Sequence, residues 1–420
     1  MLYDIFEANK NLLRPLTIYA KAMSDILIQD NSWASSLPFA KEWAGGWELF
    51  YRLGRDYKKP AWNIHEVDMG GHAICPVVEQ TAIDTPFCKL VRFKRFADNL
   101  EDIRDLKKDP IVLIVAPLSG HFATLLRDTV KTMLQDHKVF VTDWKDARFI
   151  PVSEGEFGLD DYVKLIEHFL GHLLQITDNV HVFAVCQPVV PVLAACARMS
   201  ARGEKTPASM ILMGGPIDAR KSPTTPNNLA TKNDYRWFED NLIHTVPSVF
   251  EGGGRRVYPG FLQHMGFVAM NPERHMMAHW DFYEHLVQGD NEEAQSHRDF
   301  YNEYNAVLDM PAKYYLDTIK VVFQDFLLPQ GKWVIEGVIV QPEKITQTAL
   351  LAIEGERDDI AGQGQTKASL DLCSSIPEKN KEYLLAQGAG HYGLFSGRRW
   401  RTEIYPALKD FIMKHQPVSS

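Results

Sequence analysis

Between residues 106 and 213, short and continuous apolar runs alternate with longer amphipathic stretches. A strand that is apolar at every position is buried on both faces, as happens when helices cover both sides of a parallel sheet. The sequence therefore predicts an α/β fold with a doubly wound, mostly parallel sheet. The expected strands are 110–116, 138–142, 179–185 and 209–213, and the expected helices are 122–135, 159–176 and a third that ends near 201.

The alternation stops after the fourth expected strand. Residues 219–343 are rich in aromatic residues and methionine and have a helical rather than a strand-like pattern. We expect this segment to be a mainly helical insertion, which we call the lid, between two late strands of the sheet. Its clearest helices are 236–242, 275–287 and 294–308, and the strands 346–353 and 382–386 and the helices 361–373 and 399–415 are expected after it.

The pattern divides the chain into three parts. We expect an N-terminal extension, 1–105, packed on a core that consists of 106–218 and 344–420, with the lid, 219–343, above the core. Residues 1–60 of the extension have helical spacing that Pro15 interrupts, because proline removes a helical hydrogen bond. Residues 68–96 predict loops and one or two short strands.

Composition excludes several classes of protein. The net charge is -9 and the basic residues are scattered, so no surface for nucleic acid is indicated. No apolar run approaches the roughly 20 residues that span a bilayer, and the first residues lack the basic start of a secretory signal. The five cysteines include no CxxC pair, so no disulfide framework is predicted. We expect a cytoplasmic protein without a transmembrane segment.

The strand that ends near 185 is followed by Cys186-Gln187-Pro188, which opens a helix. In α/β-hydrolases a sharp turn at this point presents the nucleophile, usually within G-x-S-x-G. Here Ala184 and Pro188 flank the nucleophile position, and Pro188 disfavours the helical conformation of Gln187, which leaves a distorted turn open. The start of the helix would stabilise a thiolate at Cys186. The alternative is a packed, inert cysteine.

Two later loops supply partners for a thiol. Gly355 closes a strand and Asp358 follows three residues later, with Asp359 as the competing acid. His391 lies in a glycine-rich loop after the last expected strand. The order nucleophile, acid, base is the one expected for this fold, and each residue follows a parallel strand. A solvated carboxylate and a surface histidine are the alternatives.

These residues predict a division of labour. His391 would take the proton of Cys186 and Asp358 would orient the imidazole. The oxyanion of the reaction needs backbone donors, for which we expect the N–H groups of Gln187 and of Leu118, with Ser119 in reserve because Pro117 has no N–H. A plain turn capped by Ser119 is the alternative for this loop.

Most aromatic residues of the lid would form its own core. A subset would contact an apolar substrate, and we take Phe267 and Trp280 of the lid, with Ser119 of the core, as the candidate substrate-binding residues.

The sequence resembles the intracellular polyhydroxybutyrate (PHB) depolymerases that use cysteine in place of serine, within the α/β-hydrolase superfamily. The matching segments are 141–147 (VTDWKDA), 185–188 (VCQP), 213–218 (MGGPID), 354–360 (EGERDDI) and 390–400 (GHYGLFSGRRW). The resemblance implies hydrolysis of poly(3-hydroxybutyrate) in native granules, with release of 3-hydroxybutyrate or oligomers. It also implies Cys186, Asp358 and His391 as nucleophile, acid and base, and the hydrophobic granule surface as partner.

Other activities remain open at this point. A polyhydroxyalkanoate synthase uses the same triad to extend a polyester from a coenzyme A thioester, but its usual G-x-C-x-G is missing here. A carboxylesterase, a thioesterase and a non-catalytic granule-associated protein are further alternatives. None of these chemistries requires a metal ion or an organic cofactor, so we expect neither. A homo-oligomer is possible.

Overall fold

The computed structural model describes residues 2–29, 32–69, 74–97 and 100–417. In this part of the chain the largest sheet has nine strands in the order β1-β2-β3-β5-β4-β6-β7-β13-β14. The strands from β4 onward run parallel, whereas β1, β2 and β3 are antiparallel. Their bounds are β1 Glu66–Asp68, β2 Ile74–Asp84, β3 Cys88–Arg95, β4 Ile111–Val115, β5 Lys138–Trp144, β6 Val180–Val185, β7 Ser209–Met213, β13 Ala349–Gly355 and β14 Lys381–Ala386.

Successive side chains of the central strand β4 enter two different cores. Leu113 and Val115 pack with helices α5 (Leu159–Ile176) and α6 (Val189–Ala201) on one face. Val112 and Ile114 pack with α4 (Arg127–Met133) and α15 (Tyr405–Lys414) on the other. Alternate side chains of a strand point to opposite faces, so an all-apolar run fits a sheet that is covered on both sides. The predicted α/β fold, with its doubly wound and mostly parallel sheet, is confirmed.

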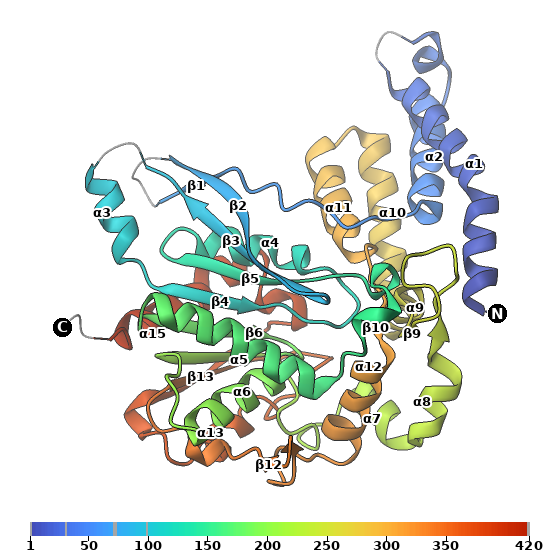
Figure 1. Ribbon diagram of the computed structural model, residues 1–420. Helices are drawn as coiled ribbons and strands as arrows, with labels where there is room; N and C mark the ends of the chain where they lie inside the picture. Colours follow the sequence, from blue (N-terminus) through green and yellow to red (C-terminus); the bar gives the residue numbers. More distant parts are fainter. Residues whose placement is uncertain (1, 30–31, 70–73, 98–99, 418–420) are drawn as a thin grey trace.

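The N-terminal part of the chain contributes to this sheet. Strands β2 and β3 pair with each other, and β3 pairs with β5, so residues before 106 extend the main sheet as well as packing on it. The sequence predicted one or two short strands here, but β2 has eleven residues. Before them, α1 (Leu2–Ile28) and α2 (Ala40–Gly54) form a helical hairpin at one end of the molecule (Figure 1).

Helix α1 continues through Pro15, where the sequence predicted an interruption. Pro15 lies on the exposed side of the helix. A proline costs an interior hydrogen bond, and at this position the freed carbonyl group of the preceding turn can be hydrated.

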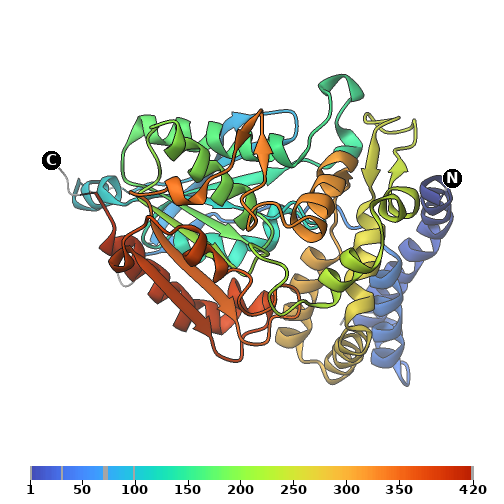
Figure 2. The same cartoon turned by 90° about the horizontal axis from the view of Figure 1, so that it is seen from below.

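The lid lies between β7 and β13 in sequence, and in space it separates the helical hairpin from the sheet (Figures 1 and 2). The three expected lid helices correspond to α8, α10 and α11. Small sheets accompany the helices. The lid elements are α7 Thr225–Lys232, α8 Tyr235–Leu242, β8 His244–Thr245, β9 Arg256–Tyr258, α9 Gly260–Met270, α10 Pro272–Gln288, α11 Asn291–Tyr304, β10 Met310–Pro311, α12 Ala312–Thr318, β11 Val334–Ile335 and β12 Val338–Ile339.

A helix expected over 361–373 is much shorter, since α13 covers only Ala368–Leu372. The preceding residues form a loop around the buried carboxylate of Glu354, which accepts the N–H groups of Gly364 and Lys367. Backbone groups that bind a side chain in this way compete with helical hydrogen bonds.

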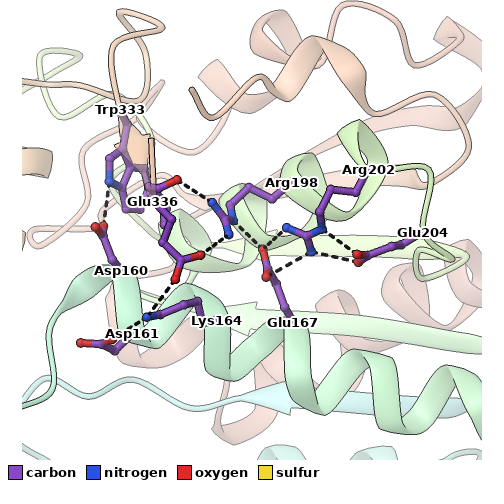
Figure 3. A network of polar contacts seen from close by, with 10 residues as sticks. Asp160, Asp161, Lys164, Glu167, Arg198, Arg202, Glu204, Trp333 and Glu336 are labelled. Atoms are coloured by element: carbon purple, nitrogen blue, oxygen red, sulfur yellow. Dashed lines mark hydrogen bonds and ion pairs between the residues drawn. The ribbon is translucent and has the colours of Figure 1, made fainter. Parts of the chain in front are cut away.

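An ionic network fixes the hairpin of β11 and β12 to helices α5 and α6 (Figure 3). Arg198 of α6 donates to Glu167 of α5 at 2.7 Å, to Glu336 at 3.2 Å and to the carbonyl oxygen of Ile335 at 2.9 Å. Trp333 donates to Asp160 at 3.1 Å. The last part of the lid is therefore anchored to the core far from its helices α9 to α11.

Within the described ranges, no helix combines the length and the apolar character needed to cross a membrane.

Candidate active site

Cys186 follows β6 in a sharp turn, residues 184–188, which we call the elbow. The φ angle of Cys186 is +67°, a left-handed conformation that residues other than glycine rarely adopt. The Cys186 N–H donates to the carbonyl oxygen of Met213 at 2.8 Å, and α6 begins three residues later. Strain of this kind persists only where the surroundings impose it, often at functional sites. Ala184 and Pro188 therefore do not prevent the turn that presents a nucleophile.

The segment after β7 lies against the elbow. A Cβ atom on Gly215 would lie 2.1 Å from the carbonyl oxygen of Cys186, so only glycine fits there. Gly214 has a φ of +59°, and a Cβ atom on it would lie 2.9 Å from Leu394 and in ordinary contact with Asp358 and His391. The two glycines thus let the chain pass close to all three expected residues, a role that the sequence analysis did not assign to them.

His391 and Asp358 meet at the carboxyl edge of the sheet. His391 Nδ1 lies 2.8 Å from Asp358 Oδ2. Asp358 Oδ1 accepts the N–H groups of Ile360 and Ala361, each at 2.9 Å, which fixes the carboxylate. The competing Asp359 is exposed and accepts from Asn271 of the lid instead. Of the two carboxylates, Asp358 is therefore the one that orients His391.

Charged neighbours control the protonation of His391. Its burial alone would lower the imidazole pKa, because water no longer stabilises the cation. Asp358 and then Cys186 act in the opposite direction and raise the pKa of His391 well above its usual value. The ring nitrogen that does not face Asp358 remains for Cys186, which lines the same cavity as His391. The three groups can thus share and transfer a proton.

The loop after β4 faces the elbow. Pro117 and Ser119 line the same cavity as Cys186, while the side chain of Leu118 is buried behind it. Among the described residues, the N–H groups of Leu118, Ser119 and Gln187 donate to no other protein group. These backbone donors are therefore available to an oxygen atom of a ligand.

A cavity of about 310 Å³ lies over Cys186 and His391. Most of its wall is apolar and comes from the lid, including Phe267 of α9. Two of the expected substrate-binding residues, Ser119 and Phe267, line it. Trp280 does not: it is 56% exposed on the outer side of α10, where its indole donates to Glu284. No residue of α10 lines this cavity, so the prediction placed Trp280 on a helix that does not reach it.

His121 is a lining residue that the sequence analysis did not single out. Its Nε2 lies 3.0 Å from the carbonyl oxygen of Tyr304, so this nitrogen carries the proton. Burial, and then the neighbouring His264, lower the pKa of His121 to about 4, so the ring is neutral near pH 7. Its position after the serine and glycine of the β4 loop is the signal that could have identified it.

A larger cavity of about 1200 Å³ lies between the helical hairpin, the start of α10 and the end of β5. Its wall mixes charged and apolar side chains and contains none of Cys186, Asp358 and His391. Size therefore does not identify the site; the arrangement of reactive groups does.

Residues 214–416 match the family model described as PHB de-polymerase C-terminus, and no curated protein matches. This match starts directly after β7, so it includes Asp358 and His391 but not Cys186.

Several solved structures are similar to this chain at low sequence identity and with TM-scores below 0.5. One describes carboxylesterases of the ammonia-oxidizing Thaumarchaeon Nitrososphaera gargenis (10% identity, 81% of this chain and 99% of that chain, TM-score 0.40). Another is a thermophilic esterase from Thermogutta terrifontis (15% identity, 81% of this chain and 99% of that chain, TM-score 0.41). A third is a thioesterase domain from the Curacin biosynthetic pathway (10% identity, 80% of this chain and 99% of that chain, TM-score 0.42). Likeness at this level says nothing about the substrate of this chain.

This chain therefore has a doubly wound α/β fold, and its residues 214–416 are similar to the C-terminal region of the PHB depolymerases.

Proposed function

We propose that this protein hydrolyses ester bonds of poly(3-hydroxybutyrate) through a covalent thioester on Cys186. One observation carries the proposal: a strained cysteine, a histidine and a carboxylate converge beneath an apolar cavity. The match of residues 214–416 to the PHB depolymerase model supports the polyester as the substrate class. We place the protein in the cytoplasm at the surface of storage granules.

The proposed reaction has two halves. His391 accepts the thiol proton, the sulfur of Cys186 bonds to the ester carbonyl carbon, and the leaving alcohol takes the proton from His391. Water then attacks the thioester while His391 accepts its proton, and the carbon–sulfur bond breaks to release the acid. Asp358 stabilises the imidazolium in both halves. The N–H groups of Leu118 and Gln187 would stabilise the oxyanion that forms each time.

The shape and polarity of the cavity suit such a substrate. Each repeat unit of polyhydroxybutyrate contains an ester and a methyl branch and carries no charge. The cavity is lined mainly by apolar side chains. Burial of apolar substrate atoms contributes roughly 25 cal/mol per Å², so a mainly apolar wall favours an uncharged chain.

The decisive experiment measures release of 3-hydroxybutyrate and its oligomers from native amorphous granules. Wild-type protein should release product and Cys186→Ala should fall to background, with unchanged thermal unfolding as proof of folding. Activity on 3-hydroxybutyryl-coenzyme A but not on granules would instead favour a synthase-like acyltransferase or a thioesterase. Equal activity of wild type and Cys186→Ala would overturn the nucleophile.

Contact with a solid polymer needs an adsorbing surface, and we propose the helical hairpin of α1 and α2 for it. Its helices pack through small or polar side chains, including Ala20, Ser24 and Ala44. Large apolar side chains point outward, as Leu12 (74% exposed), Trp43 (63%) and others do. This is the reverse of the pattern of an ordinary surface helix, and contiguous exposed apolar surface marks interaction sites.

The charges of the hairpin favour an uncharged partner. Helix α1 has three acidic and three basic residues and α2 has two of each, so their net charge is zero, whereas the chain carries -9. Anionic lipid attracts surfaces with excess Lys and Arg, which these helices lack. An apolar polyester has no such requirement.

Adsorption can be separated from catalysis. The triple variant Leu12→Gln/Trp43→Gln/Leu53→Gln should sediment with granules at least tenfold less than wild type, because less apolar surface leaves water. It should hydrolyse a soluble 4-nitrophenyl ester at the wild-type rate. The control Ile176→Gln changes an equally exposed residue at the end of α5 and should adsorb normally. The assignment would be contradicted if the triple variant bound granules as well as the wild type and the hairpin were instead buried in a stable dimer.

A further inference from the structure

The two loops that offer backbone donors to the cavity are tied to one buried aromatic cluster. Ala116 precedes Pro117 and Leu118, and side chains bind both of its backbone groups. Its N–H donates to Thr142 Oγ1 at 2.9 Å, and its carbonyl oxygen accepts from Trp144 Nε1 at 2.8 Å and from the Tyr162 hydroxyl at 3.1 Å. A carbonyl oxygen has two lone pairs, so both are used. Two of these bonds hold the peptide plane before Pro117, and the third holds the peptide plane before Ala116.

The same cluster reaches the elbow. The hydroxyl of Tyr314, in lid helix α12, donates to Oε1 of Gln187, the residue that follows Cys186. Its ring lies 5.6 Å from that of Tyr162, which in turn packs edge to face on Trp144 at 4.5 Å. All three aromatic side chains are at most 1% exposed. Core strand β5, core helix α5 and the lid thus meet beneath the two donor loops.

We propose that Trp144, Tyr162 and Tyr314 are positioning residues that hold the N–H groups of Leu118 and Gln187 at the spacing an oxyanion requires. The inference rests on the proposed function, because it concerns the same reaction. Preorganised donors stabilise charge without reorganising during the reaction, and removal of a single donor costs about 100- to 1000-fold in rate. A donor that is present but misaligned should reduce the rate by a smaller factor.

The geometry also gives the lid a part in catalysis. Tyr314 belongs to a segment that lies 127 residues after Gln187, yet its hydroxyl binds that side chain directly. A displaced α12 would release the side chain of Gln187. The N–H group of Gln187 is therefore held in position only while α12 is docked.

The test compares two reactions of Cys186 in Tyr162→Phe and Tyr314→Phe. Hydrolysis of a soluble 4-nitrophenyl ester passes through an oxyanion, whereas alkylation by iodoacetamide displaces iodide and forms none. We expect kcat for the ester to fall about 10- to 100-fold with KM within twofold of wild type, while the alkylation rate stays within twofold. Binding of a butyl aldehyde, whose adduct with the thiol places an oxygen at the same donors, should weaken by a similar factor.

Controls keep the outcomes distinct. Tyr405→Phe removes an equally buried hydroxyl bond, to Asp136 at 2.6 Å, far from the elbow, and should leave both reactions unchanged. Thermal unfolding of each variant checks its folding. Unchanged ester hydrolysis, or an equal loss of hydrolysis and alkylation, would overturn the positioning role. A wild-type protein that is alkylated quickly but hydrolyses no ester would instead refute the proposed function.

Discussion

At the residue scale, the surroundings of Cys186 differ from those of the other cysteines. Burial raises the pKa of the thiols of Cys88, Cys196 and Cys373, in the last case to about 12, so these groups stay protonated. Cys186 lines a cavity and faces a histidine with a raised pKa. A cation beside a thiol favours its thiolate, which is the reactive form.

Asp358→Asn should slow alkylation of Cys186 by iodoacetamide at pH 7 at least tenfold. Loss of the carboxylate removes the main influence that raises the pKa of His391, so the imidazolium forms only at lower pH and stabilises the thiolate less. Fast alkylation should therefore move to more alkaline pH. Mass spectrometry of labelled peptides over pH 5–9 measures this. Asp359→Asn is the matched control, and an equal effect of both changes would contradict the assignment of Asp358.

At the scale of elements, the ionic network in Figure 3 holds the end of the lid on α5 and α6. Arg198 is its centre, with only 7% of its side chain exposed and partners on α5 and on the β11–β12 hairpin. Hydrogen bonds to a charged group that is largely buried contribute more than exposed pairs, because their loss leaves partners unpaired.

Arg198→Ala should lower the free energy of unfolding by about 2–3 kcal/mol, since Glu167 and the carbonyl group of Ile335 lose their donor. Denaturant titration of the purified protein measures the change. Lys205→Ala, which breaks a pair with Asp178 that is about two-thirds exposed on both sides, should cost less than about 1 kcal/mol. Similar losses in the two variants would show that the network contributes no more than a surface pair.

At the scale of the whole molecule, one buried junction connects three parts of the chain. Tyr3 of α1 donates to Asp309 beside β10 at 2.6 Å, and Asp309 accepts the N–H of Gly260 at the start of α9 at 2.8 Å. The N–H of Asp309 donates to Asp146, which follows β5, at 3.1 Å. The helical hairpin, the lid and the core thus depend on the same carboxylates.

This junction predicts a dependence of stability on pH. Burial, and then the carboxylate of Asp309, raise the pKa of Asp146 to about 7 from an ordinary value of 3.8. A raised folded-state pKa gives stability that is complete below the unfolded pKa and is lost as pH rises through the folded one. The free energy of unfolding of the wild type should therefore decrease between about pH 4 and 7 more than that of Asp146→Asn. Parallel curves for the two proteins in urea titrations across this range would contradict the prediction.

Much of the site could be predicted because it depends on local pattern. Cys186, Asp358 and His391 each follow a strand that the sequence marks by continuous apolar residues, and parallel strands end at one edge of a sheet. The sequence favoured Asp358 and left Asp359 as the competing acid; only the structure gives the direction of the two side chains, and it places Asp358 beside His391. Trp280 was misplaced because the sequence does not indicate which lid helix reaches the cavity, and no residue of α10 lines it.

The sequence by itself determined the doubly wound core and the positions of the reactive groups, because apolar periodicity and strand ends are properties of consecutive residues. Only the tertiary structure decided that β2 and β3 join the sheet, that Cys186 adopts a left-handed turn against Gly215, and that Tyr314 binds Gln187. Each of these depends on contacts between residues far apart in the chain, which leave no period in the sequence. The free energy of such contacts comes from close packing and hydrogen bonds that form only once the chain has folded.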